Sequence, residues 1–288
     1  MTRYRVVHTT RYEFEDVAAG CTLEGRLRAR DTPFQTCRFH QIVARPLTGK
    51  RREFADAFGN RVTAFTVPAK HQRLEISAIN VVDVAPRPAR RAAAGVSWQA
   101  ARLESGSALA DEWAPFLSAT PLTAHDTDLA AYARESFPTE GPVWGCAGAR
   151  FQRSHRDFAY RPGATTVETT AIEAARLGQG VCQDFAHIGI AGLRSLGLAA
   201  RYVSGYLDTA SADLGADASH AWLSVYVPGL GWADFDPTND CPAESGYVTL
   251  AWGRDYRDVA PLSGATKGAG AHRLDVSVDM VRETTAAA

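Results

Sequence analysis

A glycine break followed by an apolar helix constrains the fold of this chain more than any other feature. Gly178 and Gly180 interrupt the preceding segment, and Cys182 opens a helical run that ends near Leu196. Asp184 falls in the first turn, where a negative charge suits the helix dipole. Helix N-termini carry free backbone N–H groups and partial positive charge, so a thiol placed there ionises more readily. The sequence therefore predicts a candidate nucleophile at Cys182.

Only strands are expected directly after this helix. The candidates are Ala200–Leu207, His220–Val227 and Gly231–Asp236, and the last two are joined by the tight turn Pro228–Leu230. A helix followed by an antiparallel sheet is an α+β arrangement. The sequence predicts that the helix bearing Cys182 packs on this sheet.

The N-terminal part alternates between apolar and polar residues with the period of a β-strand. Strand candidates follow from Tyr4 onward, separated in one place by a glycine-containing turn at Asp56–Asn60, and they are Tyr4–Phe14, Leu23–Arg30, Arg38–Ala44, Arg61–Val67 and Leu74–Val84. Several short strands joined by turns favour an antiparallel sandwich. We expect His8, His40 and His71 to be ordinary strand residues.

A segment rich in proline and arginine, Ala85–Arg91, divides the chain. It predicts a β-rich domain at residues 1–90 and a second domain at residues 91–288. In the second domain, helices are expected at Ala108–Phe116 and Asp126–Phe137, and a capping box at Thr170–Glu173 opens another. Ala251–Val259 contains Gly253–Tyr256, which is expected to be a polar loop. Leu274–Met280 alternates again and is compatible with either sheet.

Composition excludes several classes of function. The 288 residues are 45% hydrophobic and 22% charged with a net charge of −1, so nucleic acid and anionic membranes are not expected partners. No stretch resembles a signal peptide or a membrane span. The five cysteines are scattered without a C-x-x-C pair, which favours the cytoplasm over a disulfide framework or a zinc ribbon.

Acyl transfer from an amide requires a thiolate, a base and a third group that orients the imidazole. His220 begins a strand at the sheet edge and is the candidate base. Asp234 and Asp236 share one face of the next strand, because side chains alternate along a strand. Asp236 is preferred because it ends the strand, although register is not fixed by sequence and Asp234 stays open.

Each of these residues also has a structural interpretation. Cys182 beside an apolar helix can be a small buried hydrophobe. Asp184 and His187 are close in sequence and form an alternative dyad, but a helix-start aspartate and a packed histidine are favoured. A metal site built from Cys182, Asp184, His187 and His220 lacks the close paired spacing of zinc ligands and is disfavoured.

Taken together, four segments resemble the transglutaminase-like superfamily, and the likeness is greatest to its bacterial members described as putative cysteine proteases. The segments are Gly180–His187, Arg201–Tyr206, His220–Trp222 and Gly231–Asn239. The N-terminal part, with His8–Tyr12 and Asp56–Asn60, is similar to the β-rich domain that accompanies these bacterial members. The resemblance implies a papain-like triad of Cys182, His220 and Asp236.

The same resemblance implies a cysteine-dependent acyl-transfer enzyme. No cofactor or metal is expected, and calcium dependence is not implied. The expected substrate is an amide of a peptide, a protein or a glutamine side chain. The backbone N–H of Cys182 is the first candidate oxyanion donor, and Tyr160 or Trp144 the second. A catalytically silent binding or scaffold module is the alternative. The acyl acceptor and the oligomeric state are left open.

Overall fold

The alternation near the N-terminus produces two antiparallel sheets in the computed structural model, which describes residues 1–87, 95–105, 113–208 and 218–283. One sheet has the order β15-β1-β6-β3 and contains β1 (Thr2–Ala18), β3 (Gln35–Arg45), β6 (His71–Val84) and β15 (His272–Glu283). The other has the order β14-β2-β5-β4 and contains β2 (Cys21–Gly25), β4 (Arg51–Ala55), β5 (Arg61–Val67) and β14 (Leu262–Thr266). Apolar side chains of both sheets share one core.

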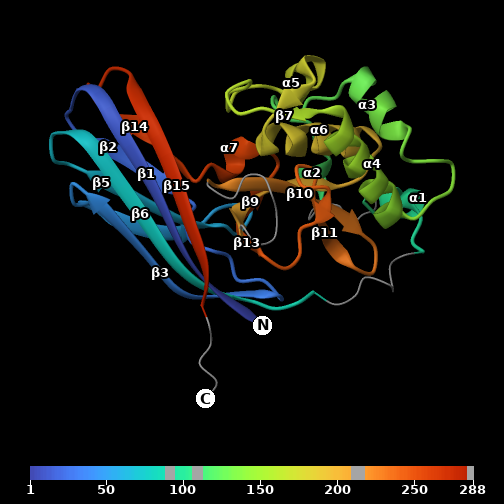
Figure 1. Cartoon of the computed structure of the whole chain (residues 1–288), viewed down its shortest axis with the longest axis horizontal. Helices are drawn as coiled ribbons and strands as arrows, with labels where there is room; N and C mark the ends of the chain where they lie inside the picture. The colour runs from blue at the N-terminus through green and yellow to red at the C-terminus, as the bar shows by residue number, and fades with distance from the viewer. Residues whose placement is uncertain (88–94, 106–112, 209–217, 284–288) are drawn as a thin grey trace.

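The last two strands come from the C-terminal part of the chain. β15 pairs with β1 from Arg3↔Glu283 to Phe14↔His272, and β14 pairs with β2. Figure 1 shows β15, in red, running beside β1 on the left of the view, with the helices on the right. The predicted strand Leu274–Met280, which the sequence could assign to either sheet, therefore belongs to the N-terminal sheet. Residues 262–283 complete sheets whose other strands lie before residue 85.

Two strands of this part differ from the sequence prediction. The strand expected at Leu23–Arg30 ends at Gly25, although Leu27 and Ala29 beyond it remain buried. β4 was not expected, because its first three residues are charged and exposed. Such a composition is typical of an edge strand, where charge discourages pairing with other chains.

The second part is built on a five-stranded sheet of order β12-β11-β10-β9-β13. Its strands are β9 (Ala200–Leu207), β10 (His220–Val227), β11 (Gly231–Asp236), β12 (Cys241–Pro242) and β13 (Tyr247–Gly253). The three strands predicted after the cysteine helix are confirmed. In the polar loop predicted at Gly253–Tyr256, Arg254 and Asp255 lie between the end of β13 and the short helix α7 (Tyr256–Val259). β13 itself was not predicted. A shift of register between Thr249 and Ala251 breaks the alternation that marks a strand.

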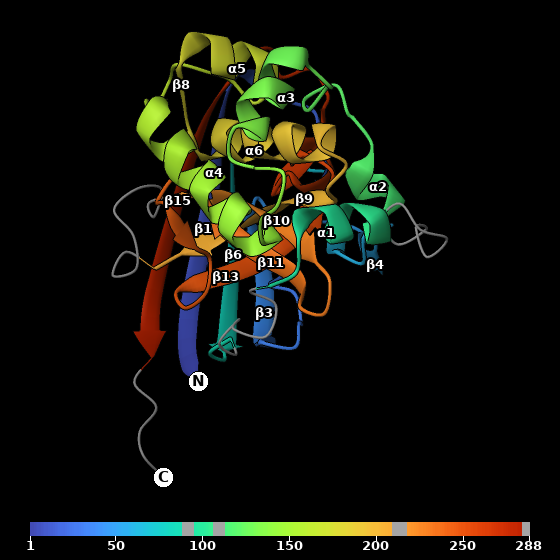
Figure 2. The same ribbon diagram turned by 90° about the vertical axis from the view of Figure 1, so that its right-hand side faces the viewer.

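The helices that precede this sheet in sequence lie mostly on one side of it, as Figure 2 shows. They are α1 (Trp98–Ser105), α2 (Ala114–Leu117), α3 (Thr127–Arg134), α4 (Val143–Asp157), α5 (Ala171–Leu177) and α6 (Cys182–Ser195). The predicted capping box is confirmed, because Thr170 and Glu173 form one on α5, and Asp126 accepts backbone N–H groups at the start of α3. α4 was missed, since its glycines and arginines obscure the apolar stripe.

Two sequence predictions fall partly outside the described residues. Of the helix expected at Ala108–Phe116, residues 108–112 are not described, and α2 begins at Ala114. Residues 88–91 of the predicted linker are likewise outside the described ranges.

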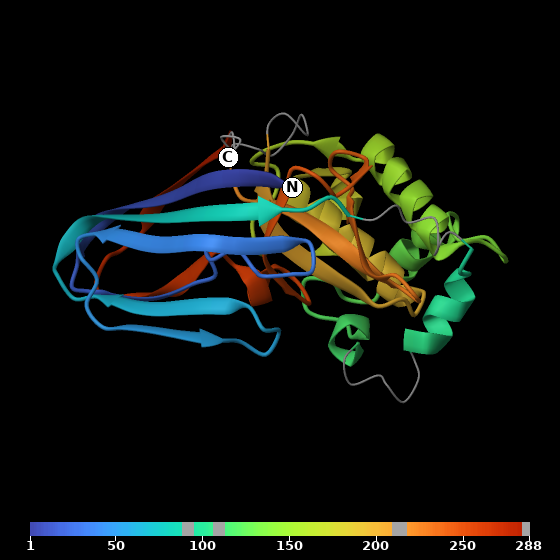
Figure 3. The same cartoon turned by 90° about the horizontal axis from the view of Figure 1, so that it is seen from below.

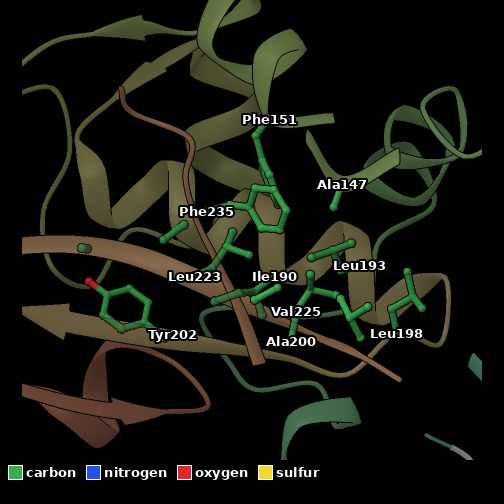
Figure 4. Packing of buried hydrophobic residues seen from close by; sticks show 14 of the residues in the cluster. Ala147, Phe151, Ile190, Leu193, Leu198, Ala200, Tyr202, Leu223, Val225 and Phe235 are labelled. Carbon is green, nitrogen blue, oxygen red and sulfur yellow. The ribbon is translucent and has the colours of Figure 1, made fainter. Parts of the chain in front are cut away.

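The apolar face of α6 packs on the five-stranded sheet. In Figure 4, Ile190 and Leu193 of the helix lie against Leu223 and Val225 of β10. Phe151 of α4 packs on Phe235 of β11, with ring centroids 5.2 Å apart. This core fixes the cysteine end of α6 relative to β10 and β11. In Figure 3, the paired N-terminal strands extend away from this helical part. No helix among the described residues is long and apolar enough to cross a membrane.

Candidate active site

Cys182 is the first residue of α6 and is half-buried. The residue before it, Val181, is extended, and its backbone N–H donates to Asp184 Oδ2 at 2.7 Å. Thr165 donates its hydroxyl to the same oxygen at 2.6 Å. A Cβ at Gly180 would lie 2.6 Å from this oxygen, so only glycine fits before the helix. The prediction that Asp184 acts as a helix-start partner is confirmed.

His220 and Asp236 form a buried pair at one end of the sheet. His220 begins β10, Asp236 ends β11, and Nε2 of the imidazole lies 2.7 Å from Oδ2 of the carboxylate. Both side chains are completely shielded from solvent. Nδ1 of His220 is also buried, with no hydrogen-bond partner in the described part of the chain.

Asp236 receives more than the histidine bond. Tyr247 donates its hydroxyl to Oδ2 at 2.8 Å, and the Asn239 amide donates to the same oxygen at 2.7 Å. The backbone N–H groups of Thr238 and Asn239 approach Oδ1 at 2.8 and 3.3 Å. Burial raises the pKa of Asp236, but the charge and hydrogen bond of His220 and these donors together hold it below its usual value. The carboxylate is thus fixed in position and kept ionised.

The charge state of His220 follows from its neighbours. Burial lowers its pKa, but the charge and hydrogen bond of Asp236 and the interaction with Cys182 outweigh burial and raise it to about 10. The imidazole is therefore protonated at neutral pH. Since Asp236 occupies Nε2, Nδ1 is the ring nitrogen without a hydrogen-bond partner among the described residues.

Asp234, the alternative carboxylate, lies elsewhere on the same strand face. Cross-strand pairing sets it opposite Ser224, whose hydroxyl donates to Asp234 Oδ1. Its other oxygen is 2.7 Å from the Arg87 guanidinium. The register of β10 with β11 therefore gives the two aspartates different partners.

His187, the alternative histidine, is completely buried within α6. Its Nε2 accepts the backbone N–H of Tyr256 at 3.2 Å, and its ring packs 5.1 Å from that of Tyr202. Burial lowers its pKa to about 3, so it is neutral. The packed role predicted for His187 is confirmed. Among the described residues, no group of three or more His, Cys, Asp or Glu side chains is placed to hold a metal ion.

Tyr247 and Asn239 were missed by the sequence reasoning. Asn239 follows Asp236 by three residues, so a local signal existed, whereas Tyr247 reaches the site only through the fold. Tyr160, a candidate oxyanion donor, is better placed than its sequence distance suggests. Its short strand β7 (Ala159–Tyr160) pairs with β8 (Gln179–Gly180) directly before Cys182. Burial, together with the charges of Cys182 and Asp236, raises the pKa of Tyr160 to about 12, so its hydroxyl is a donor.

Trp144, the other candidate donor, packs its ring 4.4 Å from that of Phe235. It lies on the first turn of α4, against the core of the second part of the chain.

Comparison with known proteins places these features in a family. Residues 4–83 match the family model of the bacterial transglutaminase-like N-terminal region, and residues 145–237 match that of the transglutaminase-like superfamily. An uncharacterized protein of Mycobacterium tuberculosis is 37% identical over 293 residues, covering 97% of this chain and 92% of its own. The chain belongs to the transglutaminase-like superfamily. A second relative, an uncharacterized protein of Mycobacterium leprae, is 36% identical over 287 residues and covers 98% of this chain and 99% of its own.

One solved structure shares the fold of this transglutaminase-like chain. It is described as a "putative cysteine protease" from Cytophaga hutchinsonii, and it matches with a TM-score of 0.78 at 23% identity. The match covers 100% of this chain and 92% of the other. The α+β fold, with a β-rich N-terminal part before a transglutaminase-like core, is therefore confirmed.

Proposed function

We propose that this protein is a cysteine-dependent acyl-transfer enzyme that acts on an amide of a peptide, a protein or a glutamine side chain. Cys182 is the nucleophile, His220 exchanges its proton, and Asp236 orients His220. The observation that carries the proposal is the buried His220–Asp236 pair, which leaves Nδ1 of a protonated imidazole free beside a thiol at a helix N-terminus.

The first half of the reaction forms a thioester. The Cys182 sulfur attacks the amide carbon, and the oxyanion that develops is stabilised by the backbone N–H of Cys182 and the Tyr160 hydroxyl. His220 then donates its Nδ1 proton to the departing nitrogen, so that the C–N bond breaks and ammonia or an amine leaves. Asp236, held by Tyr247 and Asn239, keeps the imidazole in the orientation that this transfer needs.

The second half returns the enzyme to its starting state. Now neutral, His220 accepts a proton from water or from an incoming amine as that acceptor attacks the thioester carbon. The C–S bond breaks, the thiolate is restored, and a carboxylic acid or a new amide is released. Hydrolysis and amine transfer thus use the same residues and differ only in the acceptor. The description of the Cytophaga hutchinsonii protein as a "putative cysteine protease" is consistent with a peptide amide as donor.

The compartment proposed for this chemistry is the cytoplasm. All five cysteines are free thiols, two of them buried and three partly so. Free thiols persist in a reducing environment, whereas secreted proteins of moderate size commonly form disulfides.

An activity screen tests the proposal. Glutamine-containing peptides are offered as donors with and without a primary amine, and ammonia release and amine incorporation are measured for the wild type and Cys182→Ala. We expect turnover by the wild type and none by the variant. Ammonia release without incorporation identifies water as the acceptor. Equal turnover by Cys182→Ala contradicts the proposal, and a folded wild type that turns over no amide supports the scaffold alternative.

A further inference from the structure

A large cavity lies away from the triad, between the five-stranded sheet and the loops of the N-terminal sheets. Its volume is about 1140 Å³, and none of the triad residues lines it. One wall is the loop Thr32–Phe34 and the turn at Phe58, and another is α2. Phe116 of α2 bridges the two parts, since its ring lies 5.7 Å from Phe58 and 5.1 Å from Trp232. A cavity of this size accommodates a small organic molecule.

Arg201 of β9 lines this cavity although it is only 8% exposed. Its guanidinium carbon lies 4.4 Å from the ring centre of Trp232 on β11 and 3.8 Å from that of Trp252 on β13. Its Nε donates to the Ser224 hydroxyl at 3.3 Å. Burial lowers its pKa to about 9, opposed by the charge of Asp234, and the side chain remains cationic at neutral pH.

The other charged side chains that line the cavity are paired. Arg87 lies 2.7 Å from Asp234, and Arg254 lies 2.8 Å from Asp258. Arg201 forms no ion pair with any residue in the described ranges, and its terminal N–H groups donate to none of them. Asp234 acts on Arg201 without forming an ion pair with it and is itself paired with Arg87. A buried cation with no carboxylate in contact is costly, so it favours an anion brought from outside. The described lining carries one net positive charge.

The way in which Arg201 is held restricts what can satisfy it. Indole rings cover the guanidinium, and Ser224 uses Nε, so the free donors lie along the terminal edge in the guanidinium plane. A carboxylate matches such an edge with two parallel hydrogen bonds. Around this edge the walls are aromatic, and they comprise Phe34, Phe58, Phe116, Trp232 and Trp252.

We propose that this cavity is a binding site for a small organic carboxylate, with the carboxylate on the terminal edge of Arg201 and an apolar body against the aromatic walls. A single negative charge balances the single unpaired cation. The apolar body replaces water along the walls and contributes through burial of its surface. The site is separate from Cys182 and does not depend on the acyl-transfer chemistry proposed above.

A binding measurement on the full-length wild type tests this site. N-acetyl-L-phenylalanine is titrated against N-acetyl-L-phenylalaninamide, which has nearly the same shape without the charge, and against inorganic phosphate. Calorimetry measures affinity, and tryptophan fluorescence reports on Trp232 and Trp252. We expect the acid to bind about tenfold tighter than the amide or more, as a charge-assisted pair requires. Equal binding of acid and amide, no binding of the acid, or tighter binding of phosphate overturns the proposal.

Two controls locate the site. Saturating acid should leave the rate of iodoacetamide labelling at Cys182 unchanged, and protection of Cys182 would place the ligand at the triad instead. Arg201→Met should lose the preference for acid over amide, whereas Arg254→Met, which alters a paired cation on the same cavity, should retain it. If circular dichroism shows that Arg201→Met is unfolded, Arg201→Lys takes its place. Lysine keeps the positive charge but cannot form two parallel hydrogen bonds with a carboxylate. Wild-type preference in the folded Arg201 variant overturns the assignment.

Discussion

Asn60 hydrogen-bonds both backbone groups of Trp252, accepting its N–H at Oδ1 over 3.0 Å and donating to its carbonyl at 2.9 Å. The Gln35 amide likewise accepts the backbone N–H of Thr249 and donates to its carbonyl, and both distances are 2.8 Å. Because β13 is the outermost strand of the five-stranded sheet, these amides satisfy backbone groups that a sixth strand would otherwise pair. Side chains of the N-terminal part therefore complete the outer edge of the five-stranded sheet.

Removing one of these amides should destabilise the whole chain. Asn60→Ala leaves the N–H and carbonyl of Trp252 without partners, and we expect the free energy of unfolding to fall by about 2–4 kcal/mol. Urea unfolding measures this change. Gln72→Ala is the matched control, since its exposed amide donates only to the Glu15 carbonyl and should change stability by less than about 1 kcal/mol. Equal losses of stability in the two variants would argue against a structural role for the hydrogen bonds between Asn60 and β13.

Cys182 should react with iodoacetamide near neutral pH faster than the other four cysteines. Cys21 and Cys146 are buried, which limits access to them. Cys37 and Cys241 are as accessible as Cys182, but burial raises the pKa of each. Peptide mapping after timed labelling measures the five rates. Labelling of Cys37 or Cys241 ahead of Cys182 would show that helix position and His220 do not activate the thiol.

Asp236→Asn should shift the pH dependence of activity. The pKa of His220, raised to about 10 against burial by Asp236 and Cys182, keeps the imidazolium present until strongly alkaline pH. Without the carboxylate, burial lowers this pKa, so the alkaline loss of activity should move to lower pH by more than a unit. A profile of kcat/KM against pH measures the shift, and an unchanged alkaline limb would contradict the assigned role of Asp236.

The same pKa predicts how stability changes with pH. Because the folded-state pKa of His220 lies above its ordinary value of 6.5, the pair stabilises the fold fully below pH 6.5. That contribution is lost as the pH rises from 6.5 toward about 10. Urea unfolding at a series of pH values should show this loss in the wild type and much less of it in Asp236→Asn.

Tyr247→Phe should slow catalysis without abolishing it. The substitution removes one donor from Asp236 Oδ2 and leaves the bonds from His220 and Asn239. We expect kcat to fall by roughly tenfold, the equivalent of about 1.4 kcal/mol, with KM nearly unchanged. Tyr132→Phe is the control, because its hydroxyl donates to a surface aspartate, Asp157. Equal kcat values for both variants would contradict a role for Tyr247 in supporting Asp236.

Two helical glycines should respond to alanine in opposite directions. A Cβ at Gly189 in α6 would lie 2.4 Å from a Leu223 methyl and 3.0 Å from the Phe151 ring, so we expect Gly189→Ala to cost about 1–3 kcal/mol. A Cβ at Gly148 in α4 would meet nothing nearer than Phe235 at 4.0 Å. Gly148→Ala should therefore stabilise by about 0.5–1 kcal/mol. Thermal unfolding checks both signs, and a stabilising Gly189→Ala would contradict the close contact of α6 with β10.

The features that the sequence predicted well are those set by local chemistry. The break at Gly178 and Gly180, the helix from Cys182 and the strands on either side of Pro228–Leu230 follow from turn residues and apolar periodicity over a few positions. The roles of Asp184 and His187 follow equally from their places on one helix. β13 and α4 were missed because burial by distant segments, rather than their own composition, makes them regular. β4 was missed because its residues are charged and exposed, and it becomes a strand only by pairing with β5.

By itself the sequence determined that a cysteine begins a helix and that a histidine and two aspartates follow on neighbouring strands. The tertiary structure fixed the register in which Asp236, which the sequence preferred, contacts His220, whereas a two-residue shift of β11 would bring Asp234 to that position. It also decided that β15 pairs with β1, that Tyr247 reaches Asp236, and that Arg201 has no ion-pair partner among the described residues. Contacts between residues far apart in sequence depend on the packing of whole sheets, which no local pattern encodes.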